Sequence, residues 1–162
     1  MSRTLDTMAA NHTPSGPRLK DAVLAGSVYF AAIFAIGFVF GVLRTLALDA
    51  LPNLTRLGAV LVEIPVILAL AWMICGVVMA RFSLSAREGA AIVMGVIALV
   101  LLLGAEAGLS IGMNGLSLQQ HLALYHQPSH VTGLAGQCLF ALFPWFRVRL
   151  LPPPARHLQT KP

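Results

Sequence analysis

The sequence predicts an all-α integral membrane protein, a bundle of four transmembrane helices with both chain ends in the cytoplasm. Apolar residues make up 57% of the 162 residues and charged residues only 10%, whereas soluble domains carry roughly 25% charged residues. The apolar residues are also grouped into long runs. A water-soluble chain of this length cannot hide so much apolar side chain, because small folds keep a large surface.

The first three runs are each long enough to cross a bilayer, which takes about 20 apolar residues. Residues 22–43 contain no charge at all. Residues 57–80 are interrupted only by Glu63, and residues 89–111 only by Glu106. We therefore expect three full transmembrane helices over these ranges.

A fourth helix is expected over residues 131–147, although its apolar run covers only about 24 Å of a core roughly 30 Å thick. Arg147 and Arg149 are expected to snorkel toward the interface, so that Leu150 and Leu151 lengthen the span. Its existence is also favoured by charge, because without it the basic C-terminal tail would be exported.

Basic residues are unevenly distributed around these helices. Four spans with the N-terminus inside place nine basic residues on the cytoplasmic side and two on the outer side, which is the expected bias. No basic stripe interleaved with aromatic residues indicates nucleic-acid binding. The transmembrane domain is expected over residues 20–151, between disordered cytoplasmic tails over residues 1–19 and 152–162.

The loop between the third and fourth helices carries the pattern of a short amphipathic helix. Ser117 followed by Gln120 is typical of a capping box. Leu118, Leu122 and Tyr125 then recur at helical spacing. We expect this helix to lie on the outer membrane surface.

Four polar residues, one from each long helix, fall in the same outer layer when depth is counted along the chain: Arg44, Glu63, Glu106 and Gln137. Charged side chains that face lipid are costly and usually turn toward one another. We expect Arg44 to pair with Glu63, Glu106 or both, and Gln137 to bond the remaining acceptor. Structural pairing, a ligand or ion site, and simple solvation at helix ends are all compatible with this pattern.

Small residues at intervals of four predict close helix packing in lipid. Helix 1 carries Gly37 and Gly41, and helix 3 carries Gly104, Gly108 and Gly112. Packing within the monomer is the first expectation, and homodimerisation is the alternative.

No metal or cofactor is predicted. His121, His126 and His130 have no acidic partner close in sequence, so we interpret them as surface histidines. Cys75 and Cys138 lie inside apolar runs without metal-ligand spacing, and we expect buried thiols rather than a disulfide.

Six short motifs lie between Gly37 and Phe146: Gly41-Val42-Leu43-Arg44, Glu63-Ile64-Pro65, Met94-Gly95, Ala105-Glu106, Gly136-Gln137 and Phe143-Pro144. Through these motifs the stretch resembles a group of small four-helix bacterial inner-membrane proteins of unknown function, which implies the same fold and cellular membrane but no activity.

The leading functional hypothesis is a structural or accessory component of a membrane complex, whose partners are the bilayer and other membrane subunits or a second copy of the chain. The alternative is a small proton- or cation-coupled transporter that uses Glu63 or Glu106. Its size and helix number resemble those of multidrug-resistance exporters, but those proteins carry their essential glutamate in helix 1, where this sequence has no carboxylate. No nucleophile, metal set or nucleotide motif indicates an enzyme.

Overall fold

A computed structural model describes residues 19–151 of the chain, and within them it contains helices and no strand. The elements, in order, are α1 (Leu19–Ala50), α2 (Arg56–Arg81), α3 (Glu88–Gly112), α4 (Leu118–Ala123), the 3-10 helix η1 (Leu124–His126) and α5 (Pro128–Leu150). The four long helices are long and apolar enough to cross a membrane. The predicted tails over residues 1–19 and 152–162 lie outside the described residues, apart from Leu19, which is the first residue of α1.

The helices extend beyond the apolar runs that predicted them. α1 has 32 residues, a length of about 48 Å, and so includes Asp21 in its first turn and Asp49 in its last. The absence of a carboxylate from helix 1 therefore holds only for its apolar centre. α5 has 23 residues, about 34 Å, which is enough to cross the hydrocarbon core.

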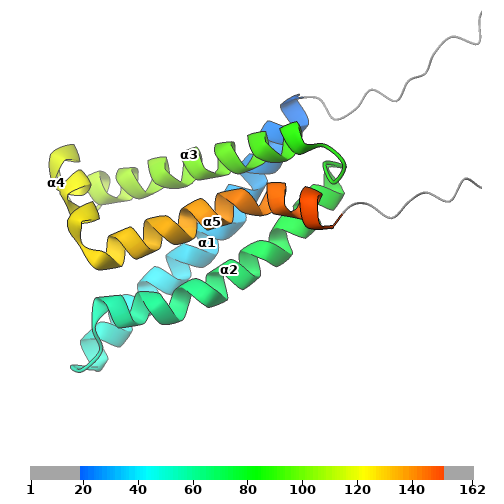
Figure 1. The fold of residues 1–162 in the computed structure, drawn as a ribbon. Helices are drawn as coiled ribbons and strands as arrows, with labels where there is room; N and C mark the ends of the chain where they lie inside the picture. Colours follow the sequence, from blue (N-terminus) through cyan, green and yellow to red (C-terminus); the bar gives the residue numbers. More distant parts are fainter. Residues whose placement is uncertain (1–18, 152–162) are drawn as a thin grey trace, which may run out of the picture.

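Each long helix packs against two others. α1 lies against α2 and α3, and α5 lies against the same two helices from the other side. In Figure 1, α1 and α2 spread away from α3 and α5 toward the end that carries α4. We call this the α4 end of the bundle; the α1–α2 loop lies there as well.

The packed core occupies the half of the bundle opposite the α4 end. It draws on the first part of α1, the last part of α2, the first two-thirds of α3 and the middle of α5. Its buried members are Ala25, Tyr29, Ile33, Ala71, Cys75, Val78, Met79, Leu84, Ala91, Met94, Ala98, Leu102, Phe140 and Phe143. We call this part the packed half.

Three glycines make room for atoms of a neighbouring helix in and around the packed half. A Cβ atom on Gly95 of α3 would collide with the carbonyl of Ala141 in α5. A Cβ on Gly26 of α1 would lie 2.7 Å from the carbonyl oxygen of Met94. Gly76 of α2 makes room for the side chain of Arg147. Small residues of this kind permit close helix contact where no hydrophobic effect drives association.

Large apolar side chains cover the outside of the bundle. Val62 is 73% exposed and Val77 70% exposed, and both lie on α2. Similar residues lie on the outer faces of α1, α3 and α5. An apolar surface of this extent is unfavourable in water and favourable in hydrocarbon, which agrees with a multi-pass membrane protein.

Candidate functional site: a polar cluster beside a cavity

Arg44 of α1 and Glu63 of α2 form an ion pair near the α4 end. The Nη1 atom of Arg44 donates a hydrogen bond of 2.7 Å to Oε2 of Glu63. The side chain of Arg44 is 28% exposed and that of Glu63 is 12% exposed. The pair therefore joins two helices at a depth where each charge alone would be poorly solvated.

Glu106 of α3 and Gln137 of α5 form the second pair. The Nε2 atom of Gln137 donates a hydrogen bond of 2.5 Å to Oε1 of Glu106. Within residues 19–151, no lysine or arginine lies within ion-pair distance of Glu106. Its carboxylate is thus bonded to a neutral amide, whereas Glu63 has a cation.

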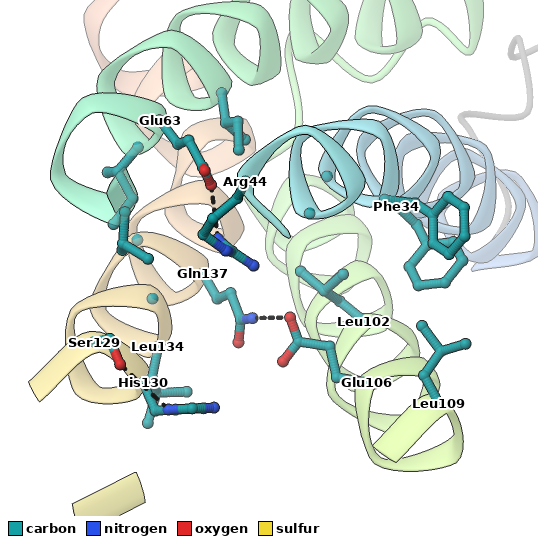
Figure 2. Close-up of a pocket in the computed structure, with 18 of the residues that line it drawn as sticks. Phe34, Arg44, Glu63, Leu102, Glu106, Leu109, Ser129, His130, Leu134 and Gln137 are labelled. Carbon is teal, nitrogen blue, oxygen red and sulfur yellow. Dashed lines mark hydrogen bonds and ion pairs between the residues drawn. The ribbon is translucent and has the colours of Figure 1, made fainter. Parts of the chain in front are cut away.

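The structure therefore brings the four predicted residues together as two pairs, each of which links two helices. Figure 2 shows Arg44 and Glu63 pointing toward each other, and Gln137 reaching across to Glu106. Whether this cluster is a ligand site or a packing device stays a prediction of the sequence.

A cavity of about 580 Å³ opens between the helices around both pairs. All four long helices line it, together with α4 and η1. Most of the lining is apolar, including Phe34, Phe38 and Phe140. A volume of this size lies within the range of small-molecule sites, which are typically mostly apolar with a few placed polar groups. We call the part of the bundle around this cavity the hollow half.

Glycines help to keep the hollow half open. Gly37, Gly41 and Gly133 line the cavity, and a Cβ atom on Gly37 or Gly133 would meet nothing within 4 Å. A Cβ on Gly41 would meet only the Nη2 atom of Arg44, at 3.8 Å.

This finding corrects the predicted role of the glycines. Gly37, Gly104, Gly108 and Gly112 have no atom of a neighbouring helix within 4 Å of an ideal Cβ, so they do not mediate close packing within the monomer. That task falls to Gly26 and the other glycines of the packed half. Each long helix is apolar on all of its faces, so the sequence did not show which glycines face a neighbouring helix.

Three polar atoms that line the cavity are buried without a hydrogen-bond partner among the described residues: Oγ of Ser110, Nδ1 of His121 and Oε1 of Gln137. Ser110 and His121 are each 7% exposed. Buried polar groups are nearly always satisfied, so each exception needs an explanation.

His121 also corrects an interpretation from sequence, because it is buried rather than a surface histidine. It lies in α4, which begins at the capping box of Ser117 and Gln120. The helix turns Leu118 and Leu122 outward, where they are 58% and 57% exposed, and turns His121 toward the cavity. His126, by contrast, is exposed.

Tyr125 of η1 lies between two of the histidines at the mouth of the cavity. Its ring makes edge contacts with His121 and His130, at centroid distances of 5.6 and 6.3 Å. Burial raises the pKa of Tyr125, and the negative charge of Glu106 raises it further. The phenol therefore stays protonated at neutral pH and keeps its ability to donate a hydrogen bond.

Sequence reasoning found Glu106 but missed Ser110 and Tyr125. A signal for Ser110 was available, because it follows Glu106 by four residues and so lies on the same helix face one turn away. Tyr125 was assigned to the apolar face of a surface helix, and nothing in the spacing showed that it would line a cavity.

Arg147 lies in the packed half, where it reaches inward rather than snorkelling. Its Nε and Nη2 atoms donate hydrogen bonds of 3.2 and 2.7 Å to the carbonyl oxygen of Trp72. The guanidinium also lies 4.5 Å from the centroid of the Trp72 ring, a cation–π contact. Arg149 instead forms an ion pair with Glu88 at this end of the bundle.

Both cysteines are free. Cys75 is buried as expected, whereas Cys138 is exposed on the outer surface of α5, which contradicts the expectation of two buried thiols. No group of three or more metal-ligating side chains occurs in the part of the chain that the structure describes.

Neither protein-family models, nor curated proteins, nor solved structures contain a match to this chain. The resemblance to small inner-membrane proteins therefore stays a prediction, and the site must be interpreted from its own geometry.

Proposed function

We propose that the chain is a small carrier of a bacterial cytoplasmic membrane, coupled to protons or cations through the cluster that contains Glu63 and Glu106. The observation that supports this proposal is the cavity of about 580 Å³ that reaches both carboxylates from between the four long helices. A bundle held together only by packing has no need of such a space, since protein interiors are normally close-packed.

The proposed topology places both ends of the chain in the cytoplasm and the α4 end at the outer face. The excess of basic residues on the assigned cytoplasmic segments supports this orientation. In this orientation, α4 lies at the outer surface with Leu118 and Leu122 toward the lipid, and the cavity opens in the outer half of the bilayer.

The two carboxylates have different roles in this proposal. Glu63 forms an ion pair with Arg44 and neutralises the charge of that arginine. Glu106 has only a neutral partner, so its charge is available to a proton or a cation that enters the cavity. We therefore assign the coupling role to Glu106 and a positioning role to Glu63.

Proton flux in proteoliposomes tests the proposal. The protein is reconstituted with an internal pH indicator and an acidic interior, and Na⁺, K⁺, Li⁺ and small organic amines are added outside in turn. At least one of them should release protons faster from wild-type vesicles than from protein-free vesicles, which also report the passive entry of neutral amine. Glu106→Gln should abolish this difference, whereas Glu88→Gln removes a carboxylate from the opposite end of the same helix and should leave it intact. Wild-type vesicles that respond to each cation no faster than protein-free vesicles would contradict the proposal.

A second candidate is the accessory role in a membrane complex. Its support is the open face of α3, where Gly104, Gly108 and Gly112 have free space beside them. Replacing Gly108 by Leu would block close approach of another helix there. If the accessory role is correct, this variant should lose a partner that co-purifies with the wild type in mild detergent.

A further inference from the structure

We infer that the cavity binds a protonated amine with an apolar body, held through the N–H bonds of its ammonium group by Glu106 and Gln137. This inference names the substrate class of the proposed carrier and so rests on that proposal.

The charge inside the cavity favours a cationic ligand. Arg44 and Glu63 neutralise each other within their ion pair, whereas Glu106 has only the amide of Gln137. Arg56 also lines the cavity, but it is exposed at the start of α2, where solvent screens its charge. The inner part of the cavity therefore carries one carboxylate that forms no ion pair with a lysine or arginine of residues 19–151.

The unpartnered atoms favour a ligand that donates hydrogen bonds. Gln137 uses its Nε2 atom to bond Glu106, so its buried and unpartnered Oε1 atom is left only as an acceptor. The Oγ atom of Ser110, which is also buried and unpartnered, can accept as well as donate. Ser110 lies one helical turn beyond Glu106 on the same face.

These groups match the bonding capacity of an ammonium ion. An –NH₃⁺ group has three N–H donors and no acceptor, and Glu106, Gln137 and Ser110 supply one acceptor each. A quaternary ammonium ion carries the same charge but has no N–H bond. A carboxylate ligand would meet Glu106 as a like charge.

The remainder of the lining favours an apolar body on the same ligand. Phe34, Phe38 and Phe140 lie among aliphatic side chains such as Ile64 and Leu102. Figure 2 shows Phe34 and Leu102 on the α1 and α3 sides of the polar cluster. Aromatic faces also attract cations that lie over them, so an aromatic amine fits both parts of the cavity.

Binding of four matched compounds to the full chain in lipid nanodiscs tests the inference. 2-Phenylethylamine, its N,N,N-trimethyl analogue, 2-phenylethanol and 3-phenylpropionate share a phenyl group and differ in the polar end. Saturation-transfer NMR and calorimetric titration should rank the amine first, at least about tenfold tighter than the trimethyl compound. Equal binding of all four compounds, or tighter binding of the alcohol or carboxylate, would overturn the inference.

Two variants locate the site. Glu106→Gln should weaken amine binding by about tenfold to a hundredfold, because it removes a charge-assisted hydrogen bond. Glu88→Gln should bind the amine like the wild type, and nanodiscs without protein correct for partition of the compounds into lipid. Amine binding that is the same in Glu106→Gln as in the wild type would overturn the inference.

Ser110→Ala covers the case in which Glu106→Gln fails to fold, because it removes an acceptor without changing charge. It should weaken binding of the amine severalfold and leave binding of the trimethyl compound unchanged; an equal loss for both compounds would contradict the inference.

The carrier proposal and the amine inference can be contradicted separately. Amine binding without proton release in vesicles would contradict the carrier function only. Proton release with Na⁺, K⁺ or Li⁺, without amine binding, would contradict only the inference that the ligand is an amine.

Discussion

Arg44 and Glu63 are 19 residues apart in the chain, on two different helices, and their side chains meet at 2.7 Å. The contact joins α1 to α2 at the α4 end of the bundle, beside the cavity that both residues line. The ion pair thus takes the place that apolar packing occupies in the other half.

Removing one member of this pair should destabilise the protein more than removing both. Arg44→Gln and Glu63→Gln each leave a charge without its partner in a poorly solvated place, and we expect each to lower the free energy of unfolding by about 1–3 kcal/mol. The double variant should lose less than the sum of the two changes. Thermal unfolding in detergent measures all three, and strictly additive losses would show that the pair does not couple the helices.

Gly95 should tolerate no side chain, whereas Gly104 on the same helix should tolerate alanine. A methyl group on Gly95 would collide with the main-chain carbonyl of Ala141, which cannot move aside without shifting α5. We expect Gly95→Ala to cost about 2 kcal/mol or more. Gly104→Ala meets open space and should be neutral or stabilise the helix by about 0.5–1 kcal/mol. Equal melting temperatures in detergent would contradict this contrast.

The cost of Gly76→Ala should depend on Arg147. An added Cβ on Gly76 would lie 2.5 Å from the Cζ atom of the Arg147 guanidinium, so the side chain must leave its bonds to the Trp72 carbonyl. Gly76→Ala should therefore destabilise the wild type and have little effect when Arg147→Ala is already present. A double-mutant cycle in detergent measures the difference, and identical costs in both backgrounds would refute the contact.

The proposed topology predicts opposite labelling of two loops. In a chain without its native cysteines, Asn53→Cys in the α1–α2 loop should react with a membrane-impermeant maleimide in intact spheroplasts. Ala86→Cys in the α2–α3 loop should react only after the membrane is permeabilised. Both positions are exposed, so a difference between them reports the side of the membrane. The reverse pattern would place the cavity in the inner half of the bilayer.

The four long helices could be predicted from the sequence because uncharged runs of this length have few alternatives. The ends of the helices could not be predicted, because an apolar run ends at the first charged residue whereas the helix continues beyond it. α1 continues past Arg44 to Ala50, and α5 begins at Pro128, whose missing amide donor is tolerated in the first turn.

The common depth of the four polar residues could also be predicted, because each helix advances a fixed distance per residue. The rotation of each helix about its own axis could not be predicted. A helix that is apolar on all sides gives no periodicity that separates the buried face from the lipid face. For that reason hydropathy did not indicate that Gly104 has free space beside it whereas Gly95 contacts α5. Nor did it indicate that His121 is buried while Leu122 is exposed.

A contact between Tyr29 and Phe140 marks the boundary between the two halves of the molecule. The hydroxyl of Tyr29 donates a hydrogen bond of 3.3 Å to the carbonyl oxygen of Phe140, and the two rings lie 4.5 Å apart. Phe140 lines the cavity, whereas Tyr29 is fully buried beneath it. Tyr29 and Phe140 therefore lie where the cavity meets the packed half. In the proposed carrier, passage of a molecule from the cavity to the opposite face would require Tyr29 of α1 and Phe140 of α5 to separate.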